Sequence, residues 1–264
     1  MKTLLICHEE DRINREALAR WLASFSDLCG ILVLRETDGR KRKRVKRELK
    51  RVGPLRMLDV LAFRAYYRAF LQSGDAAWEA DLLNQIASTY PPVPEDTPTL
   101  VSTTVNTKAS EQFIAACAPD IVIARCKQLM KQSVFEIART GTFVMHPGVC
   151  PEYRNAHGCF WALAMGDDDK VGMSLLKIDR GVDTGPVFGY FYYRDDGKTR
   201  SHIQIQHRVV FDHLDAIEEK LKQIQAGDAE RIDTRGRPSN EWGQPWLTKY
   251  LAWRRRSKRK RVTA

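Results

Sequence analysis

Residues 120–146 read DIVIARCKQLMKQSVFEIARTGTFVMH, and this stretch decides the fold class. The apolar runs 120–124 and 142–145 predict two buried strands, and residues 133–139 between them predict a helix. Strands that are joined through a crossover helix run parallel to each other. The segment therefore predicts an α/β fold.

The N-terminal residues repeat this pattern. Residues 4–7 and 31–34 are short apolar runs suited to strands, and residues 15–24 between them have helical apolar spacing. Together the two units predict a doubly wound, mostly parallel sheet that is covered by helices. No glycine stands in residues 8–12 after the first run, so the turn that binds NAD or FAD is not expected.

Two segments depart from this alternation. Residues 42–88 have apolar residues at helical spacing and predict a helical insertion. After residue 200, an amphipathic helix is predicted to end at Gly227, before irregular chain; its apolar residues are Val210, Leu214, Ile217, Leu221 and Ile224. We therefore expect a main domain over residues 1–200 and a C-terminal helical and irregular extension with a basic tail over residues 201–264.

The net charge of +10 is unevenly distributed. Residues 40–51 hold nine basic residues and one acid, and residues 254–261 hold seven more basic residues. These two runs carry +15, which leaves −5 for the rest of the chain. Such a run is either a solvated helix face or a contact for phosphates, whose affinity depends on salt.

The sequence favours a cytoplasmic protein. Its N-terminus lacks the long apolar stretch of a signal peptide. The most apolar later segment, residues 54–72, carries Arg56, Asp59, Arg64 and Arg68, which argues against a membrane-spanning helix. The six cysteines are scattered without a CxxC pair, so we expect them to be reduced and mostly buried.

Two polar residues follow predicted strands in the second half of the chain. His146 ends the strand predicted at residues 142–145, and the Pro-Gly turn after it is expected to expose the imidazole at a crevice. Asp183 lies in a glycine-rich loop after the strand predicted at residues 171–178. Because ligands of doubly wound sheets bind beyond the strand ends, both residues are candidates for the chemistry.

No metal site is expected. His202, His207 and His213 share no metal-ligand spacing with a carboxylate cluster. Residues 167–169 are three consecutive aspartates, whose side chains point in different directions, so we interpret them as a solvated turn.

These residues resemble motifs of the formyltransferase family that uses 10-formyltetrahydrofolate. His146-Pro147 with Pro151 and Tyr153-Arg154 is similar to the family's His-Pro-x-x-x-Pro-x-Tyr/Phe-Arg-Gly motif, although Asn155 stands in the glycine position. Residues 179–185, Asp-Arg-Gly-Val-Asp-Thr-Gly, are similar to its Asp-x-Gly-x-Asp-Thr-Gly loop. The resemblance covers roughly residues 95–195 well and residues 1–35 loosely.

The resemblance implies a Rossmann-like formyltransferase fold and roles for individual residues. His146 and Asp183 would be catalytic, because the histidine can polarise the formyl carbonyl or relay a proton while the carboxylate orients it. The co-substrate 10-formyltetrahydrofolate would bind two loops, without a metal or NAD; their residues are Gln128, Leu129, Met130, Asp179, Gly181 and Val182. For Leu129 and Met130, a place in the apolar core is the alternative.

The sequence departs from the family two residues before the histidine. The family has an asparagine there that donates to the developing oxyanion, a contact worth about 3 kcal/mol. Val144 stands in its place and has no hydrogen-bond donor. Three interpretations remain: another donor (Asn155, Arg125 or His157) substitutes, the enzyme works slowly with His146 alone, or the protein binds a ligand without turnover.

The acceptor is expected to be a small amine, for example an amino sugar joined to a nucleotide. Formylation of methionyl-tRNA is the alternative, because enzymes with that substrate also carry a basic insertion after the second strand. Those enzymes continue into a C-terminal β-barrel, whereas the residues after 200 look helical here. Near the end, residues 242–253 contain three tryptophans that could form a membrane or nucleic-acid contact; we expect them instead to pack on the main domain, before a disordered tail.

Overall fold

The computed structural model describes residues 1–196, 199 and 201–263. Within these residues, one seven-stranded sheet has the order β3-β2-β1-β4-β5-β7-β8. The strands are β1 (Lys2–His8), β2 (Asp27–Leu34), β3 (Thr99–Ser102), β4 (Ile121–Arg125), β5 (Gly141–His146), β7 (Gly172–Lys177) and β8 (Val187–Tyr192). The first five are parallel, whereas β7 and β8 are antiparallel to their neighbours. The predicted doubly wound, mostly parallel sheet is confirmed.

Alternate residues of the strands point to opposite faces of the sheet. Leu5 and Cys7 of β1 belong to the larger core cluster, together with residues of the helices on that face. Leu4 and Ile6 belong to a second cluster on the other face. Burial on both faces explains why the strands read as continuous apolar runs.

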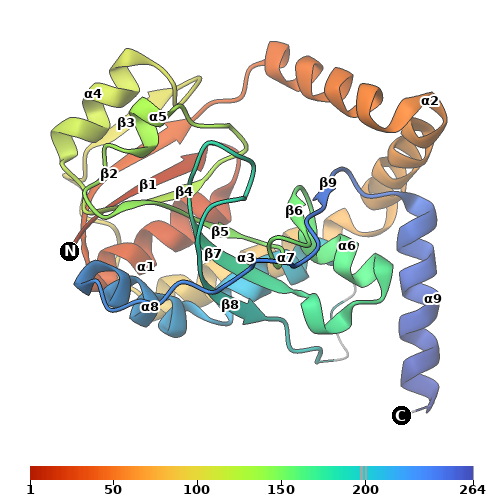
Figure 1. The fold of residues 1–264 in the computed structure, drawn as a ribbon. Helices are drawn as coiled ribbons and strands as arrows, with labels where there is room; N and C mark the ends of the chain where they lie inside the picture. The colour runs from red at the N-terminus through yellow and green to blue at the C-terminus, as the bar shows by residue number, and fades with distance from the viewer. Residues whose placement is uncertain (197–198, 200, 264) are drawn as a thin grey trace.

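Helices cover both faces (Figure 1). The first face carries α1 (Leu18–Phe25), preceded by a π-helical turn at Ile13–Ala17, and also α6 (Gly158–Met165), α7 (His202–Phe211) and α8 (Leu214–Ala226). The second face carries α4 (Lys108–Cys117) and α5 (Gln132–Phe135) over its parallel half. A 3-10 helix at Asp168–Lys170 precedes β7, and a small sheet pairs β6 (Arg154–Asn155) with β9 (Glu241–Trp242).

The insertion consists of two helices, α2 (Asp38–Phe70) and α3 (Gln72–Thr89), which include the residues predicted to be helical. A kink divides α2 at Gly53, where φ is 78° and ψ is 169°, before Pro54. Proline cannot continue the backbone hydrogen bonding of a helix, and this φ is open mainly to glycine. The basic first half of α2 therefore extends away from the sheet, and the second half turns back to α9 (Leu247–Thr263) (Figure 1).

Two predicted helices were wrong in extent. The helix expected over residues 133–139 is the short α5, because the N–H groups of Arg139 and Thr140 donate to the carbonyls of Pro119 and Asp120 and draw the chain toward β4. The helix expected from Val210 onward is split between α7 and α8, because His213 has a non-helical φ of −130°.

The predicted disordered tail was also wrong. The chain is helical through Thr263 in α9, although the side chains from residue 260 onward lie outside the described part. Tyr250 and Trp253 of α9 are buried, and the Tyr250 ring lies 5.4 Å from that of Phe63 in α2. The expected packing of the tryptophans on the main body is confirmed, since Trp242 and Trp246 both contact the ring of Trp161.

All six cysteines are free, and three of them are buried, namely Cys7, Cys150 and Cys159. No helix in the described part of the chain is long and apolar enough to cross a membrane.

Candidate active site

His146 is the last residue of β5 and is buried, with 5% of its surface exposed. Its Nε2 lies 2.9 Å from the carbonyl oxygen of Tyr153, and its Nδ1 lies 3.5 Å from Oδ2 of Asp183. The expectation of an exposed imidazole was therefore wrong. The loop after β5 folds back over the ring instead of leaving it open.

Two glycines let this loop approach the histidine. A Cβ added to Gly148 would lie 2.3 Å from the Tyr153 carbonyl oxygen and 2.8 Å from Nε2 of His146. A Cβ at Gly158, where α6 begins, would lie 2.5 Å from Cα of Gly148. Any side chain at either position would push the Tyr153 carbonyl away from the imidazole.

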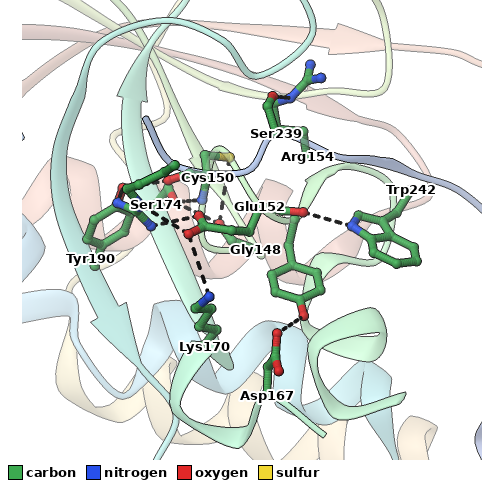
Figure 2. Close-up of polar contacts among 12 residues, drawn as sticks. Gly148, Cys150, Glu152, Arg154, Asp167, Lys170, Ser174, Tyr190, Ser239 and Trp242 are labelled. Carbon is green, nitrogen blue, oxygen red and sulfur yellow. Dashed lines mark hydrogen bonds and ion pairs between the residues drawn. The ribbon is translucent and has the colours of Figure 1, made fainter. Parts of the chain in front are cut away.

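Ser174 fixes the same loop from the neighbouring strand (Figure 2). It pairs with His146 in the register of β5 and β7. Its hydroxyl donates to the carbonyl of Gly148 at 2.7 Å and accepts from the N–H of Cys150 at 2.9 Å. Because the buried Ser174 hydroxyl both donates and accepts a hydrogen bond within this loop, it holds the loop in one conformation.

Asp183 reaches the histidine from the loop between β7 and β8. Its φ is 51°, a left-handed conformation that aspartate adopts more readily than most residues. Its Oδ2 accepts the backbone N–H of Asn155 at 2.8 Å, while Arg154 donates to the carbonyl of Val182 at 2.8 Å. Its Oδ1 has no hydrogen-bond partner among the described residues, so one carboxylate oxygen is held and the other is available.

The contacts of the imidazole restrict its hydrogens. A carbonyl oxygen only accepts, so Nε2 of His146 must carry the hydrogen in its contact with Tyr153. Nδ1 faces a carboxylate oxygen, which also accepts. A ring with hydrogens on both nitrogens can donate to both partners and would balance the charge of Asp183.

The loops predicted to bind the co-substrate lie close together. Nε of Arg180, in the loop of residues 179–183, donates to Oε1 of Gln132 at 3.0 Å, and Gln132 begins α5 two residues after the loop of residues 128–130. In the loop that begins at Asp179, the carboxylate of Asp179 accepts from the N–H of Gly181 at 2.9 Å and from the Thr184 hydroxyl at 2.7 Å.

Residues 128–130 differ from one another in surroundings. The side chain of Gln128 accepts from the N–H of Val105 and donates to the carbonyl of Thr103, so it holds the loop rather than facing outward. Leu129 is 60% exposed, whereas Met130 packs partly buried on the second core cluster. The core alternative therefore applies to Met130 and not to Leu129.

Val144 lies in an apolar cluster with Cys150, Leu176 and Val187. Of the three candidates to replace the missing donor, Asn155 directs its side-chain amide to the carbonyl of Trp242 at 2.6 Å. That amide is therefore committed to β9.

The other two candidates lie deeper in the structure. His157 has a buried Nδ1 without a hydrogen-bond partner among the described residues, and burial lowers its pKa to about 4, so the ring is neutral. Arg125, at the end of β4, donates to the carbonyl of Met145 and to Oδ1 of Asn14. Arg125 thus brings a cation beside the end of β5.

A second group of polar residues was not anticipated from the sequence. The side-chain amide of Asn14 donates to the carboxylate of Asp11, and its oxygen accepts from Nε of Arg125. Burial lowers the pKa of His207, and the charge of Asp11 acts on that pKa in the opposite direction. Burial raises the pKa of Asp11, but the hydrogen bonds from Asn14 and the charges nearby hold it below its usual value. Asp11 follows the first strand, a position that could have signalled a role, whereas His207 gave no signal.

The C-terminal residues near the site were also missed. Arg237 forms an ion pair with Glu152, and Trp242 donates to the backbone carbonyl of Glu152. No motif marks these residues, because their contacts span 85 to 90 positions of sequence. Among the described residues, no group of three histidines, cysteines or carboxylates is arranged to hold a metal ion.

Known proteins match the same part of the chain. A sequence profile of the formyl transferase family matches residues 78–191, which include His146 and Asp183. This segment of the chain is therefore similar to the formyl transferase family. It is 34% identical over 91 residues to a methionyl-tRNA formyltransferase of Desulfotalea psychrophila, covering 34% of this chain and 28% of that protein.

A further relative and two solved structures are similar to this chain. A human mitochondrial 10-formyltetrahydrofolate dehydrogenase is 35% identical over 80 residues, 30% of this chain and 9% of that protein. The chain thus spans less than a third of the length of these curated relatives. The fold is similar to a Shewanella sugar N-formyltransferase (TM-score 0.53, 12% identity, 92% of this chain and 77% of that one). It is also similar to phosphoribosylglycinamide formyltransferase of Anaplasma phagocytophilum (TM-score 0.52, 13% identity, 93% and 99%).

Proposed function

We propose that this protein transfers a formyl group from 10-formyltetrahydrofolate to the amino group of a small acceptor, such as an amino sugar joined to a nucleotide. The observation that carries the proposal is the His146–Asp183 pair, whose nitrogen and oxygen lie 3.5 Å apart at the end of β5. Both residues stand in motifs of the formyl transferase family, within the segment that its profile matches.

Asp183 is the base in this proposal. Its Oδ2 is fixed by the N–H of Asn155 and faces His146, which leaves Oδ1 to receive the proton that the attacking amine must lose. His146 faces this oxygen with Nδ1 and is itself fixed through Nε2 by the Tyr153 carbonyl, so the ring helps to keep the carboxylate in place. General base catalysis of this kind contributes about 10²- to 10⁴-fold in rate.

The co-substrate supplies an activated formyl group and leaves as tetrahydrofolate. The loop of Gln128, Leu129 and Met130 would hold its pterin on one side through its backbone and the exposed Leu129 side chain, and the loop of Asp179, Gly181 and Val182 would hold it on the other. The residues fit this role because the Arg180–Gln132 hydrogen bond joins the two loops and exposed Leu129 offers an apolar surface to a flat ring. Hydrophobic and aromatic contacts with a few polar groups are usual for such sites.

Arg125 is the donor that we assign to the developing oxyanion in place of an asparagine at position 144. Two of its nitrogens are bound by Asn14 and Met145, and its Nη2 makes no hydrogen bond among the described residues. The side chain of Asn155 is committed to β9. A charged donor next to the end of β5 can stabilise negative charge on the formyl oxygen.

Release of tetrahydrofolate tests the catalytic role of the pair. Mixing the protein with 10-formyltetrahydrofolate and a panel of amines, including nucleotide-linked amino sugars, should release tetrahydrofolate with at least one of them. His146→Ala should abolish that release. If no amine supports turnover, the catalytic proposal is wrong.

A non-catalytic role is the alternative that Val144 favours, because this residue removes a donor that the family uses. In that case the protein would bind the folate without turnover, and Val144→Asn would not create activity. If Val144→Asn instead raises an existing rate, the position belongs to the oxyanion contact and the enzyme proposal stands.

Methionyl-tRNA is a second acceptor, favoured by the exposed basic residues of α2. Seven of the nine in residues 40–51 are exposed; Arg40 and Arg44 are intermediate. Against it, residues 202–263 form α7, α8 and α9 on the main body instead of a β-barrel. RNA bound through several of these cations should dissociate steeply as salt rises. A rate on tRNA below that on the best small amine, with affinity that is insensitive to salt, would exclude tRNA.

A further inference from the structure

The chain after α8 leads through β9 to α9 (Figure 1). We call residues 232–242 of this connection the strap. At its start, the N–H of Ile232 donates to the carbonyl of Val187 at 2.8 Å, along the edge strand β8. At its end, β9 pairs with β6, where Trp242 is in register with Asn155. The strap thus spans from the outer edge of the sheet to the loop that carries the partners of His146 and Asp183.

Arg237 is the main polar contact of the strap. Its Nε and Nη2 donate to the two oxygens of Glu152 at 3.0 and 2.7 Å, and Glu152 is 6% exposed. Its Nη1 donates to the hydroxyl of Tyr190 at 2.6 Å, and that hydroxyl donates to the carbonyl of Cys150 at 2.5 Å. The guanidinium therefore holds the loop after His146 at two places, one directly and one through Tyr190.

Trp242 holds the same loop at its other end (Figure 2). Its indole N–H donates to the backbone carbonyl of Glu152 at 2.8 Å. Its ring stacks on Tyr153, with centroids 5.7 Å apart and planes 17° apart. The hydroxyl of Tyr153 donates to Asp167 at 2.5 Å, so the Tyr153 side chain is held both at its ring and at its hydroxyl. The carbonyl of the same residue is the oxygen that faces Nε2 of His146.

The charge of the Arg237–Glu152 pair is costly to bury. Taking charges even partly out of water is costly, and such pairs often add little to stability compared with apolar residues. The strap makes its bidentate pair and its indole hydrogen bond to Glu152 and stacks on the next residue, Tyr153, so its polar contacts converge on one loop. This distribution points to a role in geometry at the site.

We propose that Arg237 and Trp242 are positioning residues, which act through Glu152 and Tyr153 to keep a carbonyl oxygen against Nε2 of His146. The expected effect on kcat rests on the proposed function, whereas the expected effect on the contact between His146 and the Tyr153 carbonyl does not. When the strap contact is lost, the Tyr153 carbonyl withdraws, and Nε2 of His146 loses the partner that keeps its hydrogen in place. The imidazole can then turn away from Asp183, and the orientation of the base is lost.

The kinetic test compares Arg237→Met and Arg237→Lys with Arg235→Met. Arg235 is a matched control from the same segment, since its side chain is 90% exposed and, among the described residues, pairs with Asp233 alone. Misplacement of a catalytic group by about 1 Å can cost about 10²-fold in rate. We expect Arg237→Met to lower kcat about 10- to 100-fold with KM for 10-formyltetrahydrofolate changed less than threefold. Arg237→Lys should recover part of the loss, and Arg235→Met should match the wild type.

A second readout needs no turnover, so it separates failure of this inference from failure of the proposed function. In protein with ¹⁵N-labelled histidine, the Nε2–H signal of His146, assigned with His146→Gln, should be protected from exchange with water by the Tyr153 carbonyl. Arg237→Met and Trp242→Phe should each accelerate this exchange at least tenfold. Trp242→Phe keeps an aromatic ring at this position but removes the N–H that donates to Glu152. Arg235→Met should leave it unchanged.

The outcomes decide the inference as follows. If Arg237→Met unfolds the protein, Trp242→Phe and Arg237→Lys carry the test through the same exchange measurement. If the folded variants keep the wild-type exchange rate of His146 Nε2–H, the strap does not position the histidine and the inference is wrong. If the exchange accelerates but the wild-type protein shows no formyl transfer, the strap stands and the proposed function fails.

Discussion

At the scale of single residues, the two oxygens of Asp183 have different surroundings. Oδ2 accepts the N–H of Asn155 and faces His146, whereas Oδ1 has no hydrogen-bond partner among the described residues. This asymmetry divides the carboxylate into an oxygen that orients and an oxygen that can take a proton. The fold therefore holds the proposed base in a fixed position.

Asp183→Asn tests this division directly. The amide oxygen can still accept the N–H of Asn155, so we expect the fold to be retained, but the proton acceptor is lost. The proposed role predicts that kcat falls about 10²- to 10⁴-fold, with KM nearly unchanged. Asp169→Asn is the matched control, since Asp169 is exposed in the 3-10 helix before β7. A kcat for Asp183→Asn within threefold of the control would show that Asp183 is not the general base.

Gly148 makes a second prediction at this scale. An added methyl group would lie 2.3 Å from the Tyr153 carbonyl oxygen, so Gly148→Ala must displace backbone. We expect a loss of about 2 kcal/mol in the free energy of unfolding, measured in denaturant. Gly74→Ala is the control, because its Cβ meets no atom within 4 Å, and alanine in the α3 helix should stabilise by about 0.5–1 kcal/mol. Equal stability of the two variants would contradict the close approach.

At the scale of elements, α7 contributes two histidines to the interior, buried His202 and half-buried His207. Burial lowers the pKa of His207 to about 4, although the charge of Asp11 acts in the opposite direction. Burial also lowers the pKa of His202 well below its usual value, with neighbouring His157 adding to the effect. These rings are neutral in the folded protein, and they take up protons when the protein unfolds at mildly acidic pH.

This difference predicts how stability depends on pH. The unfolded chain binds a proton at His207 as pH falls through about 6.5, whereas the folded protein does so only near 4. The free energy of unfolding should therefore fall as pH falls between about 6.5 and 4, by up to about 1.4 kcal/mol per pH unit for this histidine. Urea unfolding of His207→Gln should show a shallower slope in this window and an unchanged slope above pH 7.5. An identical slope in both proteins would contradict the assignment.

The elements also show what sequence patterns could and could not predict. Four of the five strands of the parallel half were predicted because burial on both faces gives apolar runs, as in residues 120–124, whereas β3 is less buried and was missed. The lengths of α5 and α7 were not, since they depend on hydrogen bonds to distant carbonyls and on one non-helical residue, His213. Amphipathic spacing alone continues a helix wherever apolar residues recur, so it missed both breaks.

At the scale of the whole molecule, three distant parts of the chain form the candidate site. The end of β5 and the loop after β7 carry motifs, so His146 and Asp183 could be named from the sequence, and the structure brings them within 3.5 Å. The strap carries no motif, and its contacts with the loop after β5 span 85 to 90 residues, so Arg237 and Trp242 could not be found. The burial of His146 was missed for the same reason, because the loop that covers it is shaped by these contacts.

In the whole molecule, the basic residues of α2 lie apart from the His146–Asp183 pair. The basic residues of α2 stand on a helix that extends away from the sheet, and Glu48 of this helix accepts the N–H of Gln244 just beyond the strap. The cations are thus carried by an element that is joined to the covering of the site but separate from His146 and Asp183. An acceptor with phosphates would meet them without disturbing the pair.

Transfer of label from the formyl carbon tests the central claim most directly. Protein is mixed with 10-formyltetrahydrofolate labelled with ¹³C in the formyl group and with the amine that best supports tetrahydrofolate release. The account predicts that the label appears as a formamide on the acceptor nitrogen, with the wild type and with Asp169→Asn but not with His146→Ala. Label that is found only as free formate, or a labelled formamide that forms equally fast with His146→Ala, would contradict it.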